Sequence, residues 1–147
     1  MKVKTQRICE RVIGFSVPAD DELIVISYEG LHRLRLRPTV VVGCDPQFSE
    51  YAAYDPGSGI ACYEGREYSI IGLHGGTPVL TTDRGERLHL DTQAESLSIS
   101  GNGAETFTMK YENLSGDWVV ATFSREGNWV VLGCPYGSDL VVLQRAG

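Results

Sequence analysis

Short apolar segments recur along the whole chain, and a turn signal closes each of them. The segments are rich in Val, Ile, Thr, Tyr and Leu, whereas the intervals hold Gly, Pro, Asn and Asp, as in Asp55-Pro56-Gly57. This pattern is typical of antiparallel strands joined by hairpins. It predicts strands at residues 10–16, 22–28, 31–37, 38–43, 60–64, 67–73, 78–82, 86–91, 95–100, 105–111, 118–124, 129–134 and 139–145.

One segment departs from this pattern. Asp45 is a capping residue that precedes Pro46, and apolar residues then follow at helical spacing, so a short helix is predicted near residues 46–53. Residues 1–147 are expected to form a single all-β domain, mainly antiparallel, folded as a β-barrel or a two-sheet β-sandwich. Its core is expected to hold Val25, Leu34, Leu36, Val40, Val42, Ile70, Leu88, Leu90, Leu97, Ile99, Phe107, Met109, Phe123, Val130, Leu132 and Val141.

The sequence Gly-x-Trp-Val-Val occurs twice, at Trp118 and Trp129. A turn at residues 125–128 places Phe123 opposite Val130, and alternation then puts both tryptophans on the face away from the core. The two rings lie roughly 20 Å apart along the strands, so they do not clamp one ligand. Each is expected either to cover the edge of the sheet or to anchor a partner. The core face is expected to hold Val119, Ala121, Phe123, Val130, Leu132 and Cys134.

The most distinctive polar feature is the segment Leu-His-Arg-Leu-Arg-Leu-Arg at residues 31–37. On a strand, alternation puts Arg33, Arg35 and Arg37 on one face, about 7 Å apart. Two interpretations stay open. The arginines form a solvated face that pairs with neighbouring carboxylates, or they bind a phosphate, a carboxylate or an acidic protein surface, for which the planar guanidinium is well suited.

Four tyrosines, Tyr51, Tyr54, Tyr63 and Tyr68, surround the predicted helix and the loop that follows it. They either pack the helix onto the sheet or line a ligand pocket, because tyrosine brings a large contact area at a small cost in conformational entropy. The spacing of these residues does not distinguish the two roles.

The four cysteines, Cys9, Cys44, Cys62 and Cys134, show no tight pairing. In a chain without a secretory signal they are expected to be reduced and mostly buried. One hypothesis is that Cys44 or Cys62 acts as a nucleophile, with a neighbouring histidine as its base.

Candidate bases and metal ligands are few. His74 or His89 would serve as the base, and His89 with Asp91 would hold a metal only with help from further ligands. The sequence contains neither the GxSxG motif nor a phosphate-binding Walker loop. We therefore predict no catalytic residue, no metal and no cofactor.

Charge and hydropathy indicate which classes of partner the protein is not expected to bind. The net charge is −6: residues 1–37 carry seven basic and five acidic side chains, whereas residues 38–147 carry six basic and fourteen acidic ones. An acidic protein is a poor ligand for duplex nucleic acid, whose binding requires that phosphates be neutralised. No apolar run of about 18 residues and no signal peptide is recognised, so we expect a cytoplasmic protein that does not bind membranes.

These features together predict a non-enzymatic protein-binding module, of a small accessory, regulatory or immunity type. It is expected to recognise another macromolecule, in the first place a protein, through Arg33, Arg35, Arg37, Trp118 and Trp129. The alternative is a β-barrel carrier that binds a small molecule between the tyrosines. A third hypothesis, with less support, is a Cys/His or metal-dependent enzyme.

Overall fold

The computed structural model describes residues 2–7, 11–113, 118–134 and 139–145. Strands dominate these residues, which confirms the all-β prediction. The strands are β1 (Lys2–Arg7), β2 (Val12–Ser16), β3 (Glu22–Ser27), β4 (Leu31–Leu36), β5 (Thr39–Asp45), β6 (Tyr54–Asp55), β7 (Ile60–Tyr63), β8 (Arg66–Gly72), β9 (Arg87–Asp91), β10 (Ser96–Gly101), β11 (Ala104–Lys110), β12 (Val120–Phe123), β13 (Trp129–Gly133) and β14 (Asp139–Gln144). Nowhere in the described ranges is there a helix with the length and apolar character needed to cross a membrane.

Seven strands form the largest sheet, in the order β5-β4-β3-β2-β8-β7-β6, and neighbouring strands are antiparallel. The sheet curls, so that strands far apart in this order approach each other. The hydroxyl of Tyr63 in β7 donates to Asp45 Oδ2 at the end of β5, 3.3 Å away. Apolar side chains such as Ile24, Ile70 and Tyr54 form one core cluster on this sheet. The described strands do not close into a barrel, because β5 and β6 do not pair.

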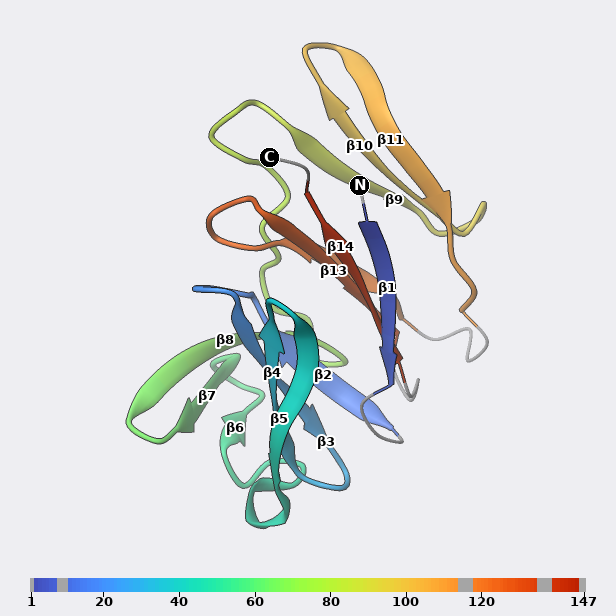
Figure 1. Ribbon diagram of the computed structural model, residues 1–147. Helices are drawn as coiled ribbons and strands as arrows, with labels where there is room; N and C mark the ends of the chain where they lie inside the picture. Colours follow the sequence, from blue (N-terminus) through green and yellow to red (C-terminus); the bar gives the residue numbers. More distant parts are fainter. Residues whose placement is uncertain (1, 8–10, 114–117, 135–138, 146–147) are drawn as a thin grey trace.

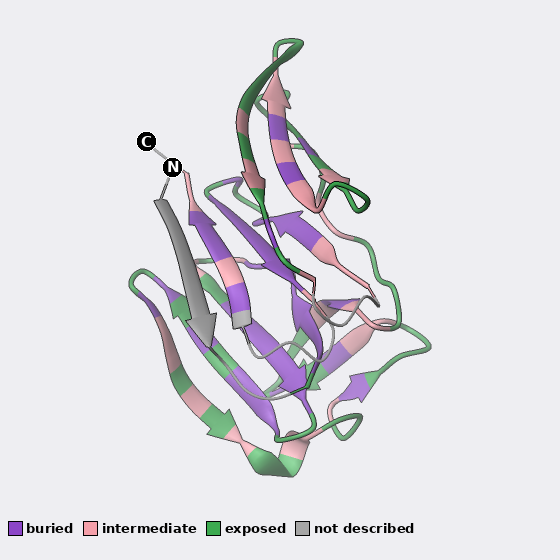
Figure 2. Cartoon of the chain, turned by 90° about the vertical axis from the view of Figure 1, so that its right-hand side faces the viewer, coloured by how far each residue is buried: buried purple, intermediate pink, exposed green. Residues whose placement is uncertain are grey.

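Two smaller sheets lie beyond this one (Figure 1). Strands β1-β14-β13-β12 form the middle layer, and β11-β10-β9 form the outer layer. Both faces of the middle layer are covered: Val131 and Val142 pack against the seven-stranded sheet, and Val130 and Leu143 pack with residues of the three-stranded sheet. Every residue of strand β13 is therefore buried. Figure 2 shows that buried residues gather in the strands at the centre of the molecule. The fold is sandwich-like.

The strand predicted at residues 78–82 is wrong. This segment is extended, but its hydrogen bonds go to two different sheets: Leu88 N donates to Leu80 O, and Phe123 N donates to Val79 O, each at 2.8 Å. Because it satisfies backbone groups of β9 and β12 at once, it forms no regular ladder with either. Instead it connects the outer sheet to the middle one.

Two strands and most of one helix differ from the predictions. The charged segment Lys2–Arg7 pairs with β14, although its sequence lacks a clear apolar alternation, and β6 is only two residues long. The helix predicted at residues 46–53 shortens to a 3-10 turn, η1 (Pro46–Phe48), which Asp45 caps by accepting from Gln47 N at 3.1 Å. Ser49 is already extended, with φ −69° and ψ 151°, and Glu50 then adopts a left-handed φ of 54°, so the helix does not continue.

Most of the predicted core is confirmed, and one member is wrong. Val25, Leu34 and Phe123 are at most 1% exposed, but Val42 is 46% exposed. The cause is a β-bulge between β4 and β5: Arg33 pairs with Gly43 and Leu34 pairs with Val41, so Val42 has no partner and turns to solvent. Val40, Leu90, Phe107, Met109 and Val141 are half-buried rather than fully buried.

Candidate functional site

Strand β4 presents two of the three predicted arginines on one face. Its burial alternates, with His32, Leu34 and Leu36 buried and Arg33 and Arg35 exposed. This alternation follows from the regular pairing with β3, in which Arg33 lies opposite Ile24 and Arg35 lies opposite Glu22. The prediction of an arginine face is therefore confirmed for these two residues.

Arg37 does not continue that face. It lies in the turn after β4, where its Nε is 3.4 Å from Asp21 Oδ2 and its guanidinium carbon is 5.7 Å from the centre of the Trp129 ring. Trp129 belongs to the core cluster between the seven-stranded and the middle sheet. Arg37 therefore contacts Asp21 and Trp129, and it is not part of a three-arginine ladder.

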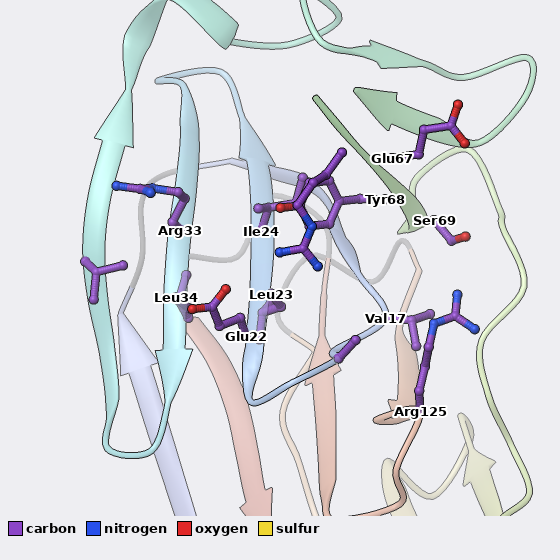
Figure 3. A pocket seen from close by; sticks show the side chains of 13 residues that line it. Val17, Glu22, Leu23, Ile24, Arg33, Leu34, Glu67, Tyr68, Ser69 and Arg125 are labelled. Carbon is purple, nitrogen blue, oxygen red and sulfur yellow. The ribbon is translucent and has the colours of Figure 1, made fainter. Parts of the chain in front are cut away.

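Arg33 lines a pocket of about 180 Å³ (Figure 3). The pocket lies where β2 ends and β3 and β8 begin, and two further arginines reach it, Arg66 from the start of β8 and Arg125 from the turn between β12 and β13. Figure 3 shows Arg33 and Arg125 on opposite sides of this space. The other lining residues are Val17, Ala19, Glu22, Leu23, Ile24, Leu34, Val42, Glu67, Tyr68 and Ser69.

Two hydrogen bonds to the loop between β2 and β3 hold the turn that carries Arg125. Its amide N–H donates to Pro18 O at 2.9 Å, and the next residue, Glu126, accepts through Oε1 from Asp20 N at 2.9 Å. Arg66 is fixed as the first residue of β8, where it pairs with Tyr63 across the β7–β8 hairpin. The arginines thus come from three separate parts of the chain.

The pocket arginines are only weakly paired. Arg33 Nη1 lies 3.9 Å from Glu64 Oε2, and these side chains are 47% and 64% exposed. Arg66 stacks over Tyr68, with 5.4 Å from the guanidinium carbon to the ring centre. Neither Arg66 nor Arg125 forms an ion pair with a carboxylate among the described residues. The guanidinium groups of Arg66 and Arg125 therefore retain N–H donors that no carboxylate among the described residues engages, and that of Arg33 has one long contact.

Alternation along one strand could not have identified Arg66 or Arg125. They share with Arg33 neither a strand nor a local motif, and only the tertiary fold brings them together. Each stands within two residues of a hairpin glycine, Gly65 or Gly127. Their position beside the glycine of a hairpin turn is the one sequence signal that would have indicated these two arginines as candidates.

The four tyrosines do not line one cavity. Tyr54 and Tyr63 are 4% and 6% exposed, and burial raises the pKa of both phenols. Tyr63 packs edge-on against Phe48, with ring centres 5.1 Å apart. Tyr51 is exposed and its hydroxyl lies 2.9 Å from His74 Nε2. Of the four, only Tyr68 reaches the pocket.

The tryptophan hairpin has the predicted register, with Phe123 opposite Val130. Trp129 is only 2% exposed, so it is not a surface anchor. Trp118 is half-buried, and its ring lies over Gly72, where an added Cβ would be 3.0 Å from Trp118 Cη2. The covering role fits Trp118, whereas the expected face away from the core is wrong for Trp129, which belongs to a core cluster.

The cysteines are more exposed than predicted. Cys44 and Cys62 are exposed and Cys134 is half-buried, whereas Cys9 lies outside the described residues. Strand β5 is an edge strand, so its alternate side chains reach solvent, and Cys62 on β7 alternates with the buried Tyr63.

Cys44 lies beside a histidine, but it is His32 rather than His74 or His89. Its Sγ is 4.0 Å from His32 Nε2, which also lies 3.2 Å from Ser27 Oγ. Burial lowers the pKa of His32, whereas partial burial and the carboxylates of Glu29 and Asp45 raise the pKa of the Cys44 thiol. Both directions favour the neutral pair, which is a poor nucleophile.

The candidate metal ligands do not come together among the described residues. His89 and Asp91 are exposed on the edge strand β9, and His74 contacts Tyr51 elsewhere. Within the described part of the chain, no three His, Cys, Asp or Glu side chains gather closely enough to hold an ion.

Comparisons with protein-family models, with curated proteins and with solved structures find no match to this chain. A function for it therefore has to be proposed from its own residues.

Proposed function

We propose that this protein is a non-enzymatic binding module, of an accessory, regulatory or immunity type, that recognises an acidic segment of another protein. The contact surface is the pocket lined by Arg33, Arg66 and Arg125, with Arg35 next to it on β4. One observation carries the proposal: three arginines from separate elements line one pocket, and among the described residues their one contact with a carboxylate is a single long ion pair.

The chemistry of the lining favours a carboxylate-bearing protein segment. Guanidinium groups bind carboxylates through paired N–H donors. Beside the arginines, the exposed Val42 offers apolar contact, whereas the lining residues Val17, Leu23 and Ile24 are at most 7% exposed. Glu22 and Glu67 also line the pocket, so it offers guanidinium groups at a few defined places and not the extended basic surface that a nucleic-acid backbone requires.

A cytoplasmic location belongs to this proposal. Cys44, Cys62 and Cys134 are free thiols, and two of them are exposed. Exposed thiols persist in a reducing compartment, whereas an oxidising one tends to pair them.

The test is the binding of a fluorescein-labelled hexaglutamate peptide, followed by anisotropy at low ionic strength. The variant Arg33→Gln/Arg66→Gln/Arg125→Gln is compared with Arg84→Gln/Arg87→Gln/Lys110→Gln, which has the same net charge but changes exposed residues elsewhere. We expect the pocket variant to lose about tenfold in affinity or more, and the control to lose much less. Equal losses would attribute binding to net charge alone and overturn the proposal.

A small-molecule carrier remains a second candidate because the pocket has a volume of about 180 Å³, enough for a compact ligand. Such a carrier would use the arginine pocket and not the tyrosines. A thermal shift with small dicarboxylates, combined with no binding of the peptide, would favour it.

A further inference from the structure

We infer that Glu64 is an internal competitor for the pocket: in the free protein it occupies Arg33, and an acidic side chain of the partner replaces it. This inference rests on the proposed function and specifies how the same site is regulated. It assigns to the β7–β8 hairpin a role in setting the affinity for the partner.

The geometry of the pair fits a contact that is easily replaced. Glu64 Oε2 lies 3.9 Å from Arg33 Nη1, which is beyond hydrogen-bond distance, and each side chain is about half-exposed or more. A partner carboxylate that forms two N–H···O bonds of about 2.8 Å with the guanidinium would make a stronger contact. The exchange therefore requires no rearrangement of the backbone.

Gly43 leaves the guanidinium of Arg33 room to change partners. It lies opposite Arg33 in the β4–β5 ladder, and a Cβ added there would be 3.0 Å from Arg33 Nη2. The arginine side chain thus lies across bare backbone of the edge strand β5. A larger residue at position 43 would force it away from this place.

The turn that holds Glu64 provides a second, independent observation. Glu64 and Gly65 have φ values of 50° and 77°, the pattern of a two-residue hairpin turn in which Asn-Gly is the ordinary choice. The β10–β11 hairpin of this chain uses that choice, with Asn102 and Gly103 at 54° and 77°. A glutamate at this position goes against the local backbone preference, and its carboxylate is directed at Arg33. Glu50 and Glu95 share this left-handed φ, so the proposal depends on the contact with Arg33 and the backbone departure only adds to it.

The substitution Glu64→Asn separates the two roles of this residue. Asparagine suits the turn, so the variant should fold with an unchanged or higher melting temperature, while the carboxylate is lost. We expect the variant to bind the labelled hexaglutamate peptide about threefold more tightly than the wild type. Glu64→Gln is the second variant, because it removes the carboxylate without introducing asparagine into the turn. We expect it to show the same gain in affinity.

The matched control is Glu67→Gln. Glu67 carries the same charge as Glu64 and lines the pocket itself, but it pairs with no arginine among the described residues. Removal of the Glu67 charge raises the affinity for the peptide only by making the surroundings of the pocket less negative. We therefore expect a smaller gain in affinity than for Glu64→Asn. In an Arg33→Gln background, Glu64→Asn should give no more than the gain of this control, because the contact between the two side chains is already absent.

The outcomes separate the two proposals. If Arg33→Gln and Arg66→Gln weaken peptide binding, but Glu64→Asn gains no more than Glu67→Gln does, the competition is refuted and the proposed function stands. If the arginine variants do not weaken binding, or the wild type does not bind the peptide at all, the proposed function fails and the competition fails with it.

Discussion

Trp129 donates its indole N–H to Asp21 Oδ1 at 2.6 Å, from within the core between two sheets. The other carboxylate oxygen of Asp21 lies 3.4 Å from Arg37, whose guanidinium lies near the indole ring. This arrangement satisfies the one polar group of the tryptophan while the ring itself is buried. It also explains why Arg37 leaves the face that Arg33 and Arg35 share.

We expect Trp129→Ala to destabilise the protein by about 3–5 kcal/mol, because it removes a buried ring from the centre of the core. Guanidinium chloride unfolding measures this change. Trp129→Phe keeps most of the ring and should cost much less. A Trp129→Ala variant as stable as the wild type would contradict the burial of this residue.

Gly133 lies where Phe15 of the seven-stranded sheet meets the middle sheet. A Cβ added at Gly133 would be 2.7 Å from Phe15 Cε1 and 2.9 Å from Leu140 Cδ2. We therefore expect Gly133→Ala to cost about 1–3 kcal/mol of unfolding free energy. Gly101→Ala is the control, because its nearest contact would be an ordinary 3.6 Å from Glu86 Cγ. Equal stabilities would contradict the close packing at Gly133.

Glu86 forms an ion pair with Arg145 that is largely buried and ties the turn before β9 to the end of β14. The hydrogen bond from Arg145 holds the pKa of Glu86 below its ordinary value of 4.5. The pair therefore contributes its full stability above pH 4.5, and this contribution is lost as the pH falls through the lower pKa of the folded state.

The test compares Glu86→Gln with the wild type by urea unfolding between pH 7 and pH 3. At pH 7 we expect the variant to be less stable by about 1–3 kcal/mol. The difference should shrink as the pH falls below 4.5. A difference that stays constant over this range would show that Glu86 contributes no pH-dependent stability.

Cys44 is exposed but should react slowly with alkylating reagents at pH 7. Burial of the thiol and the carboxylates of Glu29 and Asp45 raise its pKa, so little thiolate is present. Iodoacetamide labelling followed by mass spectrometry of the Cys44 peptide should accelerate steeply above pH 9. Rapid labelling at pH 7 would instead revive the hypothesis of a thiol enzyme.

Local patterns predicted most of the strands and several registers correctly. In the tryptophan hairpin, alternation and one turn were enough to place Phe123 opposite Val130. The same reasoning placed Arg33 and Arg35 together on β4. These relationships depend only on residues close in sequence, and the hydrogen bonds of a hairpin fix them.

The second face of the tryptophan hairpin shows where that reasoning ends. Thr122 and Ser124 are polar, which is typical of a solvent-facing side, yet they are at most 1% exposed. Their hydroxyls accept hydrogen bonds from backbone N–H groups, Thr122 from Val79 at 2.9 Å and Ser124 from Trp129 at 3.1 Å. A sheet covered on both sides can therefore carry polar residues, and the alternation of one strand does not reveal the second cover.

The pocket also depends on residues that lie far apart in the sequence. Arg33, Arg66 and Arg125 meet only because the seven-stranded sheet curls and the β12–β13 turn is hydrogen-bonded to Pro18 and Asp20. Prediction from sequence identified one of these three arginines, because the other two are brought to the pocket only by tertiary structure.

The most direct test of acid recognition at the pocket is an NMR titration of the labelled protein with the hexaglutamate peptide, observing the arginine Nε–Hε resonances. We expect the signals of Arg33, Arg66 and Arg125 to shift together and saturate with one dissociation constant, while Arg87 on β9 remains unchanged. Shifts that are centred on other arginines, or uniform across all of them, would contradict the assignment of this pocket as the binding site.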